Sequence, residues 1–294
     1  MKTVIILAAA ALVNASAGAA QKPASYDWTA VDRAMGRSGA PQPGGVRKFG
    51  FARSDLHVTV HGVAIRPPLA LGSWVAFRPM GDGRAMVTGD LVLTEDEIDP
   101  VISRLQEGGV EQSALHNHLL AETPRVMYMH VMAHGDAVRL AQTVHAALLL
   151  TKTPLAPPSR VTTPLRLDMD TIAAARVLGH AGTVNNGVYQ VSVPRREKIR
   201  EGGIEVPPSM GVATGINIQP IDSTRAVATG DFVLLAGQVN PVIRALHANG
   251  ITMTALHSHM LGESPRLFFM HFWADDSTAK VLAGLKAALS AAGQ

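Results

Sequence analysis

The segment "ALHNHLLAETPRVMYMH", Ala114–His130, places three histidines, a glutamate and an arginine within one short stretch. The same polar residues return at the same spacing in "ALHSHMLGESPRLFFMH", Ala255–His271. In both segments an HxH motif precedes a Glu, a Pro-Arg pair and a third histidine. A chain that carries this pattern twice contains two copies of one structural unit, and the repeat therefore guides the interpretation of the whole sequence.

The repeat extends beyond the histidine segments. An offset of 141 residues aligns Thr88–Val131 with Thr229–Phe272 without a gap, and 20 of these 44 positions are identical. Chance would give about one identity in fifteen positions, given ordinary residue usage. The period is far longer than that of a solenoid repeat, so the sequence predicts two similar lobes rather than an array.

The proline-rich stretch "TKTPLAPPSRVTTP", Thr151–Pro164, lies between the copies and lacks apolar periodicity, which is typical of a linker. We therefore expect four parts in the chain of 294 residues. These are a signal peptide over 1–20, a first lobe over 21–150, a linker over 151–164 and a second lobe over 165–294.

Each copy shows the same order of predicted elements, namely two strands, a helix, two strands and a helix. We expect a helix near Asp99–Gln106, with Asp99 as its N-cap and Pro100 at its first helical position. The resulting ββαββα unit, with its helices packed on an antiparallel sheet, predicts an α+β fold for both lobes.

The N-terminus predicts export. Lys2 precedes an apolar run, Val4–Val13, and small residues then provide a cleavage site near Ala20. This arrangement is typical of a secretory signal peptide, so we expect a periplasmic or secreted protein. No later segment reaches the ~20 apolar residues of a membrane span. The scattered basic residues give a net charge of only +3, which argues against nucleic acid as a partner.

The chain contains no cysteine, so any metal must be bound by nitrogen and oxygen ligands. Residues two apart in a strand point to one face, which brings together the two histidines of each HxH motif. If the following turn is centred near position 123 or 124, His130 lies opposite one of them. Three imidazoles suit a divalent ion, zinc above all. The predicted metal ligands are His116, His118, His130, His257, His259 and His271.

The spacing that both copies share also identifies candidate catalytic residues. Glu122 and Glu263 could serve as a general base or as a fourth metal ligand. Arg125 and Arg266 could hold a carboxylate or phosphate group of a substrate, or could pair with a neighbouring acidic residue.

Asp90 and Asp231 occupy the other shared acidic position, within "TGD". They could orient a ligating histidine from outside the ligand set. An ordinary residue at a turn or at the end of a strand is the interpretation that we prefer from the sequence.

Three functions remain open on these residues. The first is a metal-dependent hydrolase that acts on a small anionic substrate. The second is a non-catalytic periplasmic protein that binds a metal or another ligand. The third is a metal-free phosphoesterase that uses histidines for acid–base catalysis. The sequence leaves open whether the two histidine sets form one site or two.

The stretch from "TGDLVLTEDEIDPVISRL" to "PRVMYMH", within Thr88–His130, resembles the LppY/LpqO-type bacterial envelope proteins, a family of unknown function. The resemblance covers both halves, from about Asp32 to the end. It implies residence in the cell envelope and a duplicated architecture. It implies no particular activity. This chain lacks the cysteine of a lipoprotein, which favours a free periplasmic or secreted form.

Overall fold

The computed structural model describes residues 26–156 and 167–294. The predicted signal peptide and positions 157–164 of the predicted linker lie outside these ranges. The start of that linker packs on the first lobe, because Thr153 is buried and the Lys152 N–H donates to Glu97 at 2.8 Å. No helix within the described ranges is long and apolar enough to cross a bilayer.

Both lobes share the order of their six main strands and their longer helices, while η1 (Pro43–Gly45) and β8 (Glu122–Thr123) occur in the first lobe alone among the described residues. The first lobe consists of α1 (Thr29–Ala34), β1 (Ala40–Gln42), η1 (Pro43–Gly45), β2 (Val46–Ala52), β3 (Thr59–Val60), β4 (Val63–Ala64), α2 (Pro67–Ala70), β5 (Gly72–Gly81), β6 (Arg84–Leu93), α3 (Glu95–Glu107), β7 (Glu111–His116), β8 (Glu122–Thr123), β9 (Met127–Asp136) and α4 (Ala137–Leu148). The second lobe consists of α5 (Thr171–Leu178), β10 (Gly182–Asn185), β11 (Val188–Pro194), β12 (Arg200–Glu201), β13 (Ile204–Glu205), η2 (Pro208–Met210), β14 (Ala213–Pro220), β15 (Arg225–Leu234), α6 (Ala236–Ala248), β16 (Thr252–His257), β17 (Phe268–Ser277) and α7 (Thr278–Ala291).

Each lobe is built on a six-stranded antiparallel sheet. The strand orders are β1-β2-β5-β6-β9-β7 and β10-β11-β14-β15-β17-β16, so equivalent strands hold equivalent places. The predicted ββαββα unit corresponds to β5, β6, α3, β7, β9 and α4 in the first lobe. The α+β fold with two similar lobes is therefore confirmed.

Two local expectations need correction. An extra helix and a β-hairpin precede the predicted unit in each lobe, because the duplication extends further upstream than the identical residues show. The first predicted helix begins at Glu95 and not near Asp99. The Glu97 carboxylate accepts from the Thr94 N–H at 2.9 Å and closes that earlier N-terminus, so Pro100 lies inside the helix.

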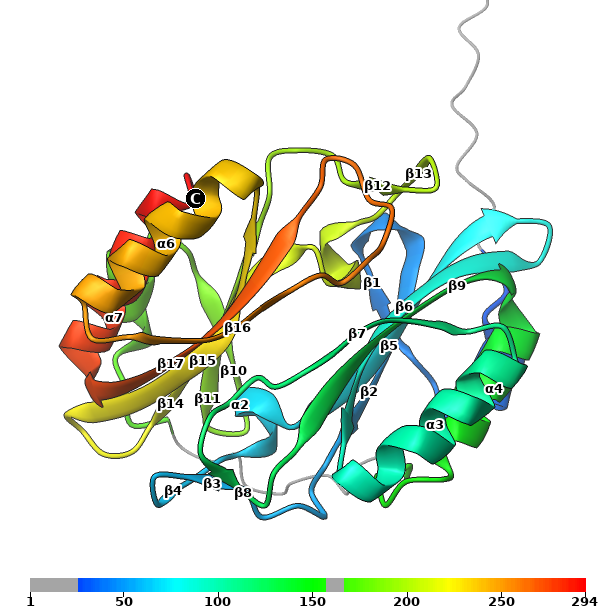
Figure 1. Cartoon of the computed structure of the whole chain (residues 1–294), viewed down its shortest axis with the longest axis horizontal. Helices are drawn as coiled ribbons and strands as arrows, with labels where there is room; N and C mark the ends of the chain where they lie inside the picture. The colour runs from blue at the N-terminus through cyan, green and yellow to red at the C-terminus, as the bar shows by residue number, and fades with distance from the viewer. Residues whose placement is uncertain (1–25, 157–166) are drawn as a thin grey trace, which may run out of the picture.

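The molecule has four layers, with the longer helices α3, α4, α6 and α7 outside and the two sheets facing each other inside (Figure 1). One apolar core fills the space between each sheet and its own helices. Two further apolar clusters mix side chains from both lobes and occupy the space between the sheets. The centre of the protein is therefore an interface between lobes.

Short arms cross this interface in both directions. The segment around α2 lies on the second sheet, where the Gln219 amide accepts from the Arg66 N–H at 2.9 Å and donates to the Ala64 carbonyl at 2.8 Å. In return, η2 lies on the first sheet, where the Thr88 hydroxyl donates to the Met210 carbonyl at 3.2 Å. These reciprocal contacts fix the orientation of one lobe against the other.

A buried arginine ties sheet to helix in each lobe, and the two differ in a way that a mutation can test. Arg53 is fully buried and bonds to the Glu97 carboxylate at 2.7 Å, whereas Arg195 bonds to the neutral amide of Gln238 at 3.1 Å. We predict that Arg53→Ala lowers the unfolding free energy by about 3–5 kcal/mol, since it leaves the buried Glu97 carboxylate without its counter-charge.

The matched variant Arg195→Ala leaves behind the neutral Gln238 amide and the Glu197 carboxylate, which is 39% exposed and can be solvated, so its loss should be about 1–3 kcal/mol. Urea unfolding of the two variants measures both values. Equal losses would show that the buried carboxylate is not what makes Arg53 important.

Candidate functional site

The six predicted histidines meet in one cluster between the lobes. The three closest pairs of histidine rings each take one histidine from each lobe. The centroids of His116 and His257 lie 3.6 Å apart, those of His118 and His271 3.7 Å, and those of His130 and His259 3.7 Å. The question left open by the sequence is thereby answered, because the two sets form one site across a pseudo-two-fold axis.

Strand register explains how each lobe contributes its share. In the β7–β9 pair, Ala114 lies opposite His130 and His116 lies opposite Tyr128. The expected direct pairing of His130 with His116 or His118 is therefore wrong. The chain does not turn tightly after β7: it leaves the sheet and forms β8, which pairs with β3. His130 is the diagonal neighbour of His116, with 5.0 Å between ring centroids.

Two aspartates also belong to the site. Asp90 lies opposite His130 in the β6–β9 register, and Asp231 lies opposite His271 in β15–β17. An Asp90 oxygen is 3.5 Å from Nε2 of His118, and an Asp231 oxygen is 2.9 Å from Nε2 of His259. Both carboxylates stand well inside long strands. The preferred interpretation of them as turn or strand-end residues is therefore wrong.

All six Nε2 atoms are buried and none makes a well-directed hydrogen bond, although that of His259 lies 2.9 Å from an Asp231 oxygen. Nδ1 of five of the rings lies within hydrogen-bonding distance of a backbone carbonyl, from 2.7 Å for His271 to 3.3 Å for His130 and His257. A carbonyl can only accept, so Nδ1 carries the proton and Nε2 keeps a free lone pair. This is the tautomer that binds a metal through Nε2.

The HxH loops are held in place by the opposite lobe. The Thr254 hydroxyl donates to the His118 carbonyl at 2.6 Å, and the Ser113 hydroxyl donates to the His259 carbonyl at 2.5 Å. Because these two bonds are related by the pseudo-two-fold, each lobe positions a histidine of its partner lobe. The cluster is therefore preorganised by the lobe interface itself.

An aromatic ring closes each end of the cluster. Tyr128 stacks on His118 with 3.4 Å between centroids, and Phe269 stacks on His259 with 3.5 Å. The two aromatic residues occupy equivalent positions on β9 and β17. They extend the apolar surroundings of the imidazoles and keep the histidine rings in one orientation.

Burial keeps the histidines neutral. It lowers the pKa of His116 to about 4 and those of His257 and His259 to about 3. The pKa values of His118, His130 and His271 fall well below the ordinary value, mainly through burial and also through the neighbouring histidines.

Burial acts in the opposite direction on the carboxyls, because it disfavours their charged form. It raises the pKa of Asp90 to about 8 and that of Asp231 to about 6. At neutral pH the centre therefore contains neutral imidazoles and carboxyls that ionise near neutrality.

Three groups of side chains place their ligand atoms within 4.8 Å of one another. They are His116, His118 and His271; His116, His130 and His257; and Asp231, His257 and His259. The donor set of imidazole nitrogens and one carboxylate suits zinc or a similar divalent ion. The residues therefore fit the metal that the sequence predicts.

The predicted catalytic residues lie outside these groups. Glu122 is half-buried in β8, and the Glu263 carboxylate accepts from the Leu267 N–H at 2.9 Å within its own loop. Arg266 bonds to the same carboxylate at 3.4 Å, and Arg125 is exposed. The structure thus gathers the histidines but leaves these four residues in the loops around them.

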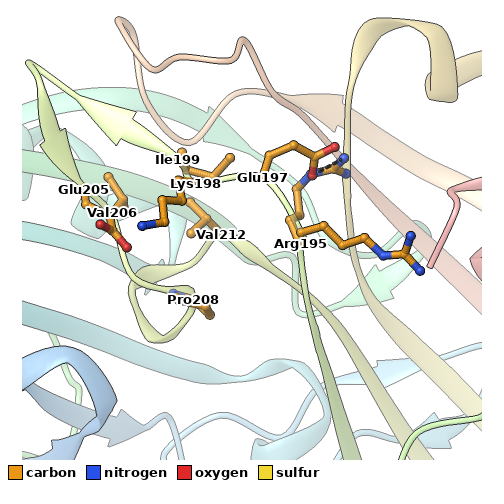
Figure 2. Close-up of a pocket in the computed structure, with 9 residues that line it drawn as sticks. Arg195, Glu197, Lys198, Ile199, Glu205, Val206, Pro208 and Val212 are labelled. Atoms are coloured by element: carbon orange, nitrogen blue, oxygen red, sulfur yellow. Dashed lines mark hydrogen bonds and ion pairs between the residues drawn. The ribbon is translucent and has the colours of Figure 1, made fainter.

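Neither of two surface hollows in the described residues is lined by a histidine of the cluster. One is bordered by charged residues of the second lobe, Arg195, Lys198 and Glu205 among them (Figure 2). The other lies beside Val110 and Leu261. The histidine centre is thus separate from both.

The fold and the cluster define a duplicated α+β protein with a histidine centre between its lobes. The sequence profile described as Domain of Unknown Function (DUF1259) matches residues 29–149 and 172–291. The chain therefore belongs to this family and contains two tandem copies of its domain.

No curated protein matches the sequence. Among solved structures, the chain is similar to the crystal structure of a trimeric bacterial microcompartment shell protein PduB at 11% identity, with 87% of this chain and 90% of that chain covered. The TM-score of 0.21 supports no argument from that likeness.

The pKa shifts predict acid sensitivity in the metal-free protein. A histidine whose pKa is lowered by folding favours the native state fully above about pH 6.5, and this contribution is lost as the pH falls toward 4. The raised pKa values of Asp90 and Asp231 act in the opposite sense, but the six histidines outnumber them.

We therefore expect the metal-free protein to lose several kcal/mol of unfolding free energy between pH 7 and pH 4. Urea unfolding in the presence of a chelator measures the unfolding free energy at each pH. In the double variant His116→Ala/His257→Ala the unfolding free energy should depend less steeply on pH. Stability that is constant or rises on acidification would contradict the burial of six neutral imidazoles.

Proposed function

We propose that the protein binds a divalent metal ion, zinc or a similar ion, in the histidine cluster between its lobes. The single observation that carries this proposal is the set of six buried Nε2 atoms that make no well-directed hydrogen bond, with the Asp90 and Asp231 carboxylates beside two of them. A buried polar atom left unpaired lowers the unfolding free energy by about 1–3 kcal/mol. A cluster of such nitrogens therefore destabilises the fold unless a ligand binds them. A metal ion accepts several imidazole lone pairs at once.

The pseudo-two-fold axis suggests two related metal positions. His116, His118 and His271 form one triad, with Asp90 3.5 Å from His118. The equivalent residues of the other half are His257, His259 and His130 with Asp231. In each half, two histidines come from one lobe and the third comes from the other. Metal binding would therefore also lock the lobes together.

Burial of the cluster favours a metal-binding protein without turnover. A structural or storage site surrounds its metal completely, whereas a catalytic zinc keeps one position open. The aromatic residues at both ends and the apolar clusters on either side restrict access to the histidines.

A metal-dependent hydrolase of a small anionic substrate is the second candidate. Three histidine ligands with an open fourth position are typical of catalytic zinc, which lowers the pKa of bound water to about 7. Asp90 and Asp231 stand closer to the histidines than the predicted bases Glu122 and Glu263 do, and they would take the role of general base. Arg125 and Arg266 would then attract an anionic substrate to the loops around the centre.

Metal-free acid–base catalysis is less well supported. A histidine with a pKa of about 3 or 4 is almost entirely unprotonated at neutral pH. It is a poor general acid under those conditions, because an effective catalyst has a pKa near the working pH.

Export to the periplasm or the medium belongs to the proposal as well. It is supported by the apolar N-terminal run and the cleavage site near Ala20 in the sequence. The resemblance to LppY/LpqO-type envelope proteins agrees with this location.

The first test is metal content. We expect the purified protein to bind zinc stoichiometrically and His116→Ala/His118→Ala to lose most of it. An excess of a hundredfold over Kd should stabilise the parent by about 2.7 kcal/mol. His247→Ala, an exposed histidine of α6, is the matched control and should bind as the parent does. Equal metal content in all three proteins would reject the cluster as the site.

The second test separates catalysis from binding. If the metal-loaded protein hydrolyses a small phosphoester, ester or peptide, Asp231→Asn should lower kcat about a hundredfold. Glu122→Gln should leave kcat unchanged, because Glu122 lies outside the ligand groups. If the metal-loaded protein hydrolyses none of the three substrate classes, the hydrolase candidate is rejected and the non-catalytic metal-binding function is supported.

A further inference from the structure

The two halves of the centre differ most at one pair of equivalent positions. Trp74 of β5 lies opposite Asp90, and Gly215 of β14 lies opposite Asp231. Both positions are on the sheet face that looks toward the other lobe. One half therefore has an indole beside its aspartate, and the other half has no side chain there at all.

On the first-lobe side, Trp74 is tightly packed. A Cβ added at Gly211 of the crossing arm would lie only 2.9 Å from the indole. Lys48 lies above the same ring, with Nζ 3.9 Å from its centroid, and donates to the Ser209 carbonyl at 3.3 Å. The indole and the lysine together fill the space beside Asp90, whose side chain is 8% exposed.

On the second-lobe side, the equivalent space is open. A Cβ added at Gly215 would meet no atom within 4 Å. Its neighbour on β11 is Ser192, which is exposed, and Gln190 takes the place of Lys48. The Asp231 side chain is 17% exposed, about twice the value for Asp90. The space directly beside Gly215 is thus unfilled, and the Asp231 carboxylate is the more exposed of the two.

We propose that small ligands reach the metal centre past Gly215 and bind on the Asp231 side, while Trp74 and Lys48 close the Asp90 side. This inference rests on the proposed metal site. It makes the two halves unequal: the Asp90 half holds its metal structurally, and the Asp231 half exchanges water or a small anion. Because the space beside Gly215 corresponds to one missing indole, the ligand must be small.

The nature of the ligand follows from the charges. A divalent ion in the Asp231 half outweighs the single carboxylate, so the open position attracts water or a small anion such as azide. Lys48, the cation near the centre on the other side, is already engaged with Ser209 and with the Trp74 ring. It therefore supports closure of the Asp90 half rather than ligand capture.

Azide titration of the cobalt-loaded full-length protein tests the inference, with the visible absorption of Co²⁺ as the readout. We expect azide to perturb the spectrum of the parent. In Gly215→Trp the apparent azide affinity should fall about tenfold or more through steric exclusion, while cobalt content stays unchanged. Gly215→Leu is a second variant with less bulk and should show the same trend.

The matched control is Gly50→Trp. Gly50 also has open space around a built Cβ, and it lies next to Trp74 on the closed side. This variant should bind azide as the parent does. Unchanged azide affinity in both Gly215 variants, equal loss in Gly50→Trp, or no azide response in the cobalt-loaded parent would overturn the inference. Failure of the parent to bind cobalt would instead reject the metal site itself.

Discussion

The structure depends on the burial of six imidazole nitrogens at the contact between two sheets. Their Nε2 atoms make no well-directed hydrogen bond in the described protein, although Asp231 lies 2.9 Å from that of His259. The backbone bonds of five Nδ1 atoms hold the rings in place. Such an arrangement would weaken the interface unless a ligand completed it. The lobe contact and the proposed metal site are therefore one and the same feature, and the stability of one should follow the occupancy of the other.

Duplication of the lobe provides the second set of histidines and the side chains that position the first set. Each lobe brings an HxH motif and a third histidine, but the three closest histidine–histidine pairs join residues of different lobes. The hydroxyl of Thr254 holds the His118 loop, and Ser113 holds the His259 loop, so each lobe also positions the ligands of the other. A half-chain would present three histidines on an exposed sheet face with nothing to complete or orient the centre.

The α+β lobes and the six histidines could be predicted from the sequence. The predictions that were wrong have physical reasons. The alternation in HxH and the repeat identify the six histidines and the α+β lobes, because strand periodicity and duplication are local properties. The convergence of both sets depends on how two sheets face each other, which no local pattern specifies. A tight turn after β7 predicts that Glu122 lies near the histidines, whereas the chain makes a longer excursion through β8.

The sequence favours a turn or strand-end role for Asp90, because a carboxylate inside a buried strand is uncommon. The alternation of the polar residues Thr88 and Asp90 within an apolar strand is the signal that points to the site. Differences between the two lobes at equivalent positions also cannot be interpreted until the strand register is known. The difference between Trp74 and Gly215 becomes relevant to the histidine centre only because the strand register places each opposite an aspartate of that centre.

The most direct measurement is anomalous X-ray diffraction from crystals of the zinc-loaded protein at the zinc absorption edge. The account predicts anomalous peaks between the two sheets, about 2.0–2.1 Å from Nε2 atoms contributed by both lobes. Peaks confined to the outer surface, or imidazoles of the two lobes that turn away from each other around an empty interface, would contradict it.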